Sequence, residues 1–189
     1  MEAGTMQKVT RAELLDLATY DRERDRIREA AMRAKAERRV HVGPHLTFLF
    51  ENRETTRYQI QEMLRAERLY REPEIVHELE TYNELLGGPG ELGCSLLIEI
   101  ADPADRDLKL RAWLKLVEHL YVRTADGRKV RATFDPRQVG EDRLSSVQYL
   151  KFAVGGAAPL AVGSDLPALS AEAALTPGQR AALAQDLAS

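Results

Sequence analysis

The chain has 189 residues, of which 44% are hydrophobic and 30% charged, and its formal net charge at pH 7 is -3. This balance is typical of a folded domain with a substantial core and excludes an intrinsically disordered chain. The small negative charge offers no general attraction to nucleic acids or anionic membranes. No apolar run approaches the roughly 18 residues that span a bilayer, and the N-terminus lacks a signal-peptide core, so we expect a soluble, cytoplasmic protein.

The chain contains one cysteine, Cys94, so neither an internal disulfide nor a multi-cysteine metal site is possible. Cys94 begins the apolar run 94–100, where a small hydrophobic side chain belongs. Because burial raises the pKa of a thiol, we predict a packed, unreactive cysteine in preference to a nucleophile.

The first forty residues are predicted to be helical. Thr10 and Glu13 have the spacing of a capping box for a helix that begins at Arg11. An arginine-rich helix is predicted over 22–38, with a thin apolar stripe at i, i+3, i+4 and i+7 formed by Ile27, Ala30, Ala31 and Ala34.

Residues 21–39 contain eight basic and five acidic side chains. This excess of three positive charges would suit a nucleic acid or an acidic partner. No aromatic side chains interleave the arginines, so we favour a solvated face held by pairs such as Glu29–Arg33.

A strand and two helices are predicted next. Residues 45–51 alternate, which places Leu46, Phe48 and Phe50 on one strand face and His45, Thr47, Leu49 and Glu51 on the other. Helices are expected over 56–70 and 74–86, separated by Pro73, and a Gly-Gly-Pro-Gly run at 87–90 ends the second.

The following elements are mostly strands. A buried strand is predicted over 94–100, and Asp102 with Pro103 begins a helix that reaches about His119. The segments 120–123 and 129–134 flank a Thr-Ala-Asp-Gly turn and predict a hairpin, and the last strand is expected over 146–152.

The composition changes after residue 152 to Ala, Gly, Pro and Ser. This change predicts a linker-like extension over 153–175, followed by a C-terminal helix over 176–189. Its Leu183 and Leu187 stripe must dock, either on the same domain or on a partner.

Helices and strands do not alternate as regular β-α-β units. We therefore predict an α+β fold: a mainly antiparallel sheet of about five to six strands, covered by helices. The domain would span residues 1–152, with an N-terminal helical segment over 1–39 and a C-terminal docking helix.

The sequence contains no phosphate-binding glycine loop, nucleophile elbow, H-E-x-x-H motif or EF-hand loop. Polar residues in unexpected places are the remaining candidates. Glu67 falls on the apolar stripe of the helix over 56–70, where a carboxylate must be protonated, paired or metal-bound. We favour a pair with Arg71 over a functional carboxylate.

Glu74, His77 and Glu78 share one helical stripe. The Glu-x-x-His spacing is the one used in di-iron bundles, so these residues are candidate ligands for a divalent metal such as iron, manganese or zinc. The alternative, a solvated acidic face, is favoured. His45, after Gly-Pro, is a candidate ligand, a general base, or a histidine that satisfies a turn carbonyl.

Arg143, Ser145 and Ser146 form a polar group immediately before a strand. An arginine fork with two hydroxyl groups could bind an anion. Hydrogen bonds within the turn explain the same residues equally well.

Four long segments resemble an uncharacterised bacterial family catalogued as "domain of unknown function 3501". They are 43–53 (GPHLTFLFENR), 58–68 (YQIQEMLRAER), 77–83 (HELETYN) and 140–150 (GEDRLSSVQYL). The resemblance extends over essentially the whole chain. It implies no established fold, activity or catalytic residue.

The resemblance does imply a context. Genes of this family are associated with neighbours that encode rubrerythrin-like di-iron proteins and an iron–sulfur oxidoreductase. It also implies that relatives carry Asp-His-Pro where this chain has Asp165, Leu166 and Pro167. If that histidine is a ligand in relatives, its absence here argues against a metal role for the tail.

Three hypotheses follow. The first is an accessory or interaction protein of a redox and iron-handling system, with a rubrerythrin-like protein or an iron–sulfur oxidoreductase as partner. The second is a metal-dependent enzyme or metal carrier that uses His45, Glu67 and His77 with nearby carboxylates. Nucleic-acid binding through the arginine-rich helix ranks last.

Overall fold

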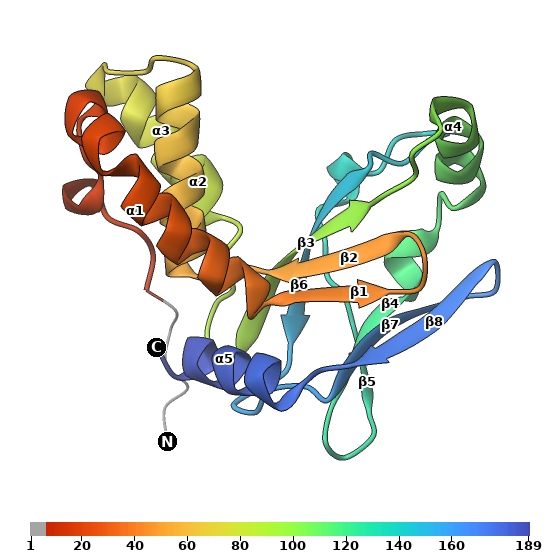
Figure 1. Cartoon of the computed structure of the whole chain (residues 1–189). Coiled ribbons are helices and arrows are strands. Elements are labelled where there is room, and N and C mark those ends of the chain that lie inside the picture. The colour runs from red at the N-terminus through yellow and green to blue at the C-terminus, as the bar shows by residue number, and fades with distance from the viewer. Residues whose placement is uncertain (1–6) are drawn as a thin grey trace.

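The structure is a computed structural model that describes residues 7–189. Within that range it contains five α-helices and eight β-strands (Figure 1). The helices are α1 (Leu17–Ala36), α2 (Arg53–Ala66), α3 (Glu72–Asn83), α4 (Pro103–Ala112) and α5 (Pro177–Ala188). The strands are β1 (Arg39–Val42), β2 (Leu46–Phe50), β3 (Glu91–Ile98), β4 (Leu120–Arg123), β5 (Lys129–Arg131), β6 (Val147–Ala153), β7 (Ala161–Leu166) and β8 (Leu169–Ala174).

The strands form two four-stranded antiparallel sheets, ordered β1-β2-β3-β6 and β5-β4-β7-β8. Both sheets contribute to one main hydrophobic core, with Phe48 and Leu96 from the first and Val122 and Val162 from the second. The predicted α+β class is therefore confirmed. The prediction of five to six strands was too low.

Two corners join the sheets. Thr133 pairs with Lys151 of β6, and β1 contacts β8. Beside the first corner, the side chain of Gln138 takes the place of a neighbouring strand. Its Nε2 donates to the Tyr149 carbonyl at 2.9 Å, and its Oε1 accepts from the Tyr149 amide at 2.8 Å. The outer edge of β6 is thus hydrogen-bonded at both Tyr149 and Lys151.

Helices α1, α2 and α3 stand together at one end of the first sheet (Figure 1). Helices α2 and α3 and the segment before α1 form a second, smaller core of Val9, Leu14, Ile60, Leu64, Ile75 and Leu79. Ion pairs at 2.8 Å (Arg24–Glu62) and 2.6 Å (Arg65–Asp21) bring the N-terminal half of α1 to the C-terminal half of α2. The opposite ends of these two helices meet near α5.

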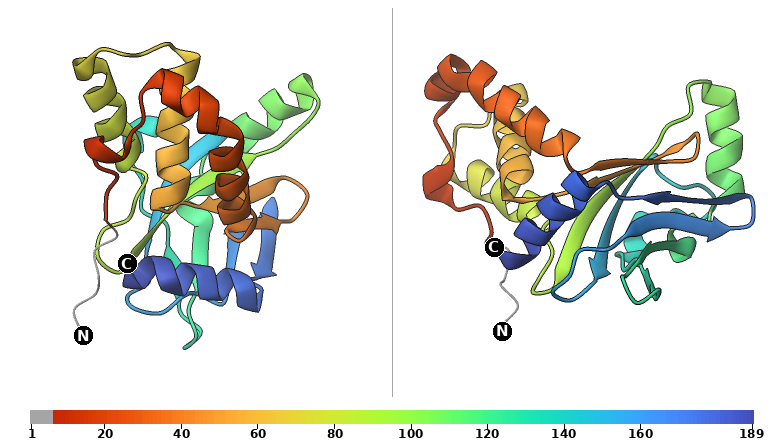
Figure 2. Two further views of the ribbon diagram at one scale, coloured as in Figure 1. Left: turned by 60° about the vertical axis from the view of Figure 1, so that its left-hand side comes forward. Right: turned by 60° about the horizontal axis from the view of Figure 1, so that its bottom comes forward.

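The C-terminal helix docks on its own chain. Leu183 and Leu187 lie in the main core, as the apolar stripe requires. The carboxylate of Asp186 accepts from Arg38, and Gln179 Nε2 donates to the Arg39 carbonyl at 2.9 Å. Figure 2 shows α5 lying along the end of the β part.

The predicted linker over 153–175 is wrong, because this segment forms the β7–β8 hairpin of the second sheet. One of its glycines, Gly163, is required by close packing. A Cβ atom on Gly163 would lie 2.5 Å from the Ala171 carbonyl oxygen and 3.0 Å from the Tyr121 hydroxyl. Small side chains are needed here for the strands to approach.

Several helix boundaries also differ from the prediction. Helix α2 ends at Ala66 and not at Tyr70, because Arg68 adopts a left-handed φ of 53° and the chain turns there. Helix α4 ends at Ala112, and a short 3-10 turn (Leu116–His119) follows. None of the helices within residues 7–189 has the length and apolar character needed to cross a membrane.

Candidate functional site

His45 lies in the turn between β1 and β2. Its Nδ1 is 3.1 Å from the carbonyl oxygen of Glu99, and its ring centroid is 5.6 Å from that of Trp113. The ring thus contacts a carbonyl, as in the alternative of a histidine that satisfies a turn carbonyl, but this carbonyl belongs to the segment after β3 and not to the turn.

Glu67 is exposed and caps the C-terminus of α2. The prediction that it shares the apolar stripe was wrong, because the helix ends one residue before it. The predicted ion pair between Glu67 and Arg71 is absent among residues 7–189. Nearby ion pairs join other residues, Arg11 with Glu72 and Arg65 with Asp21.

Glu74, His77 and Glu78 lie on α3, and His77 is exposed. The Glu74 carboxylate accepts from the Arg71 amide at 3.3 Å and so caps its own helix. Helix α3 stands with α1 and α2 at one end of the first sheet. The turn of the β1–β2 hairpin, which contains His45, points away from these helices (Figure 1). Within residues 7–189 no group of three or more His, Cys, Asp or Glu side chains is placed to hold a metal ion. The described chain does not bring the five predicted ligands together.

Two members of the predicted anion-binding group, Arg143 and Ser145, have partners for their side chains within the protein. Arg143 Nε lies 2.8 Å from Asp107 Oδ1, and Ser145 Oγ accepts from the Val147 amide at 3.3 Å. The backbone carbonyl of Ser146 accepts from the Ile98 amide at 2.7 Å. Any anion here would compete with Asp107 for Arg143.

The arginine-rich helix α1 carries internal ion pairs. The predicted Glu29–Arg33 pair is present at 2.7 Å, and Arg26 is paired with Glu23. Arg24 is paired with Glu62 of the neighbouring helix α2. Such pairs are typical of a solvated helix face. The prediction of a buried cysteine is also confirmed: Cys94 is 2% exposed, and its burial raises the pKa of the thiol well above its ordinary value.

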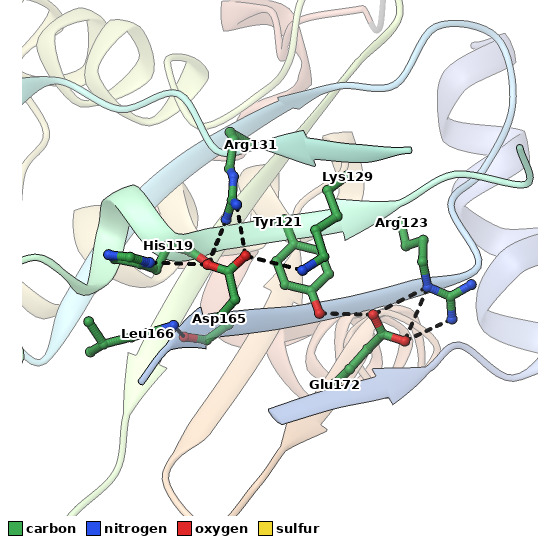
Figure 3. A network of polar contacts seen from close by, with 9 residues as sticks. His119, Tyr121, Arg123, Lys129, Arg131, Asp165, Leu166 and Glu172 are labelled. Carbon is green, nitrogen blue, oxygen red and sulfur yellow. Dashed lines mark hydrogen bonds and ion pairs between the residues drawn. The ribbon is translucent and has the colours of Figure 1, made fainter. Parts of the chain in front are cut away.

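A network of charged side chains covers one face of the second sheet (Figure 3). Asp165 of β7 accepts from Arg131 at 2.7 and 2.8 Å and from Lys129 at 3.1 Å. Its Oδ1 is also 3.1 Å from His119 Nδ1. The hydrogen bonds from Arg131, Lys129 and His119 hold the pKa of Asp165 well below its ordinary value.

Glu172 of β8 organises the other half of this network (Figure 3). It accepts from the Tyr121 hydroxyl at 2.9 Å and from Arg123 at 2.8 Å. Burial and the hydrogen bond to Glu172 raise the pKa of Tyr121 to about 12. Lys129 Nζ lies 4.3 Å from the centre of the Tyr121 ring, within the range of a cation–π contact.

Sequence reasoning missed this network, since its members are separated along the chain. Only the pairing of β4 with β7 makes His119 and Asp165 neighbours. Figure 3 also shows Leu166, which follows Asp165 at the position where the resemblance implies a histidine in relatives. The charged groups of this network are hydrogen-bonded to one another on an exposed face of the sheet. We therefore assign the network a structural role, which is to hold β4, β5, β7 and β8 together.

A cleft of about 950 Å³ lies where the C-terminal end of α1, the N-terminal end of α2 and the C-terminal end of α5 meet. It shares Glu13, Ala30, Glu54 and Arg57 with a smaller cavity of about 260 Å³. The two cavities adjoin along the α1–α2 interface. Ligand sites in proteins commonly have volumes of about 300–1,000 Å³.

The cleft walls are charged. Arg33, Arg38, Arg53 and Arg57 line it, together with Glu13, Glu37, Glu54 and Asp186. Arg38 is occupied by Asp186 at 2.8 Å, in a pair whose side chains are only 6% and 7% exposed. Arg53 is paired with Glu13 at 2.6 Å. Burial acts to raise the pKa of Glu13, but hydrogen bonds from Thr10 and Arg53 outweigh it and lower that pKa.

The pattern in the sequence did not reveal the cleft. Its lining residues come from segments between Gln7 and Ser189, which only tertiary packing brings together. The sequence did single out two of the lining residues, because Ala30 and Ala34 belong to the predicted apolar stripe of α1.

The structure thus defines an α+β protein with two packed antiparallel sheets, a helical unit, and a charged cleft where α1, α2 and α5 meet. The model of the family "Protein of unknown function (DUF3501)" matches residues 8–187. The chain belongs to this family, as the four sequence segments indicated. A comparison with curated proteins found no match.

A solved structure has the same fold. It is a crystal structure of a novel protein of unknown function from Burkholderia pseudomallei K96243, with a TM-score of 0.88 and 30% sequence identity. The match covers 96% of this chain and 100% of that chain. The fold is therefore shared with this relative over 96% of the chain.

Proposed function

We propose that this protein acts by binding, as an accessory or interaction protein, and that the cleft between α1, α2 and α5 is its binding site. One observation carries the proposal: a cleft of about 950 Å³ whose walls combine arginine side chains from two helices with carboxylates. Its volume and mixed polarity suit a charged segment of a partner or a polar small molecule.

The partner class in this proposal comes from the family resemblance. A rubrerythrin-like di-iron protein or an iron–sulfur oxidoreductase would place the protein in a redox and iron-handling system. Helix α5 docks on its own chain, with Leu183 and Leu187 buried, so its apolar stripe is not available to a partner. We therefore propose that the partner binds at the cleft.

Co-purification tests the proposal. The tagged full chain would be recovered from its native cells together with an Arg33→Gln/Arg57→Gln variant, which neutralises two cleft arginines. Arg28→Gln is the matched control, since Arg28 is exposed on α1 and does not line the cleft. Circular dichroism would check that all three proteins are folded.

We expect wild type and the Arg28 variant to recover a rubrerythrin-like or iron–sulfur protein, identified by mass spectrometry. The double variant should recover at least about tenfold less, as expected when charge-assisted contacts are lost. Equal recovery by the double variant would remove the cleft from the proposal. Failure of the wild type to recover either partner class would refute the partner assignment.

A further inference from the structure

One wall of the cleft contains a buried hydrogen-bond donor with no acceptor. Arg53 Nε has no partner among the described residues, although it is inaccessible to solvent. The same guanidinium is held in place by Glu13, which binds Nη2 at 2.6 Å. The Arg53 side chain as a whole is 41% exposed and lines the cleft, so a negative group in the cleft can reach the accessible part of this guanidinium.

Arg57 lies one helical turn beyond Arg53 on α2 and lines both cavities. The ion pairs found within residues 7–189 engage Arg53 and Arg33 but not Arg57. Arg33 faces the same cleft from α1, and its pair with Glu29 is highly exposed, with side chains 67% and 73% accessible. Such a surface pair contributes little and is easily exchanged.

The first turn of α2 adds backbone donors to this wall. Asn52 caps the helix by accepting from the Thr55 amide at 2.9 Å. The amides of Arg53 and Glu54, the first two of the helix, have no acceptor within the helix. Together with the helix dipole they favour a negative group at this end.

The acidic residues of the cleft limit how much negative charge a ligand can carry. Glu13 and Asp186 are engaged by Arg53 and Arg38. Glu37 lies 3.7 Å from Arg38. Glu54 stands at the second helical position of α2 and would repel a second negative group. The balance suits one oxyanion group and disfavours a polyanion.

We infer that Arg53, Arg57 and the open first turn of α2 form a subsite for a single oxyanion group, a carboxylate or a phosphate, with Arg33 opposite. The inference rests on the proposed function, since it names the chemistry of the group that the cleft holds. It applies equally to a carboxylate presented by a partner protein and to the phosphate of a small molecule.

Isothermal titration calorimetry on the full chain tests the subsite with two probes: inorganic phosphate and a short blocked peptide that contains one glutamate. Sodium chloride of matched ionic strength is the reference. We expect binding of at least one probe, and an affinity at least about tenfold lower for Arg57→Gln. Arg28→Gln should bind like the wild type. Tighter binding of phosphate would assign a small phosphorylated ligand, and tighter binding of the peptide a partner carboxylate.

The subsite is refuted if neither probe exceeds chloride, or if Arg57→Gln binds like the wild type. Arg57 has no ion pair within the described chain to lose, so its variant should fold, and thermal unfolding would verify this. Failure here is distinct from failure of the proposed function. Partner recovery that depends on the cleft, without probe binding, would discard the subsite alone, and probe binding without any recovered partner would discard the partner.

Discussion

Arg38 and Asp186 form a buried, bidentate ion pair that joins the end of α1 to α5. Arg38 Nε lies 2.8 Å from Asp186 Oδ2 and Nη2 lies 3.0 Å from Oδ1, across 148 residues of sequence. Arg38 Nη1 also donates to the Ala34 carbonyl at 2.9 Å. The pair lines the cleft and fixes the position of two of its walls.

Asp186→Ala should therefore destabilise the protein strongly. It would leave the Arg38 guanidinium buried without its carboxylate, which costs about 3–5 kcal/mol. Urea unfolding followed by circular dichroism would measure the loss. A double variant, Arg38→Met/Asp186→Leu, removes both charges and should recover most of the stability. A loss below about 1 kcal/mol for the single variant would show that the pair is not buried in solution.

Ser95→Ala should destabilise the first sheet. Glu51 is 7% exposed, and its carboxylate accepts from the Ser95 hydroxyl at 2.8 Å and from the Thr55 hydroxyl at 2.6 Å. Removing one donor leaves a buried carboxylate oxygen unsatisfied, so we expect a loss of about 1–3 kcal/mol. Ser170→Ala, at an exposed position of β8, is the control and should change stability by less than about 0.5 kcal/mol. Equal effects of the two variants would argue against the predicted role of Ser95.

Gly163→Ala should destabilise the second sheet by about 1–3 kcal/mol. The new methyl group would lie 2.5 Å from a backbone oxygen of Ala171, which cannot move away cheaply. Gly156→Ala is the matched control, because nothing lies within 4 Å of a Cβ atom there. Thermal unfolding would compare the two. The Gly163 variant should also shift the absorbance titration of Tyr121, whose hydroxyl is 3.0 Å from the new atom.

Arg131→Gln should reduce the part of the free energy of unfolding that is lost at acid pH. The pKa of Asp165 is depressed in the folded protein, chiefly by the hydrogen bonds from Arg131. The ionised carboxylate therefore stabilises the folded state above its unfolded-state pKa of about 3.9, and this stabilisation is lost as the pH falls toward the folded-state pKa. Arg131 is half exposed, so we expect a loss of only about 1 kcal/mol at neutral pH. Stability should then fall less steeply between about pH 4 and pH 2.

Urea unfolding at several pH values would measure this change, and carboxyl NMR would follow Asp165 directly. The pKa of Asp165 should rise toward its ordinary value in the variant. An unchanged Asp165 titration in Arg131→Gln would contradict the assignment. Arg180→Gln on the exposed face of α5 serves as the control.

Local patterns predicted the parts of the fold that depend on local spacing. The alternation of Leu46, Phe48 and Phe50 identified the buried face of β2, because side chains alternate along any strand. The hairpin of β4 and β5 followed from its Asp-Gly turn. The Glu29–Arg33 pair needed only helical spacing.

The errors arose where tertiary packing decides the outcome. Residues 153–175 have the composition of a linker, yet they form a hairpin in which Gly163 must be small for β7 and β8 to pack closely. Glu67 was placed on a buried stripe because nothing local signals the left-handed turn at Arg68. The sequence did not reveal the cleft for the same reason: Arg53 and Arg57 of α2 line it together with Asp186 of α5 only in the folded chain.

The side chain of Gln138 has a consequence for how other proteins can recognise this one. It occupies the backbone groups of Tyr149, and Thr133 occupies those of Lys151, so β6 offers no open ladder at these positions. A partner cannot add a strand to the sheet there, which is a common mode of peptide capture. A partner that binds at this side of the molecule must contact side chains, which give specificity where main-chain pairing gives chiefly affinity.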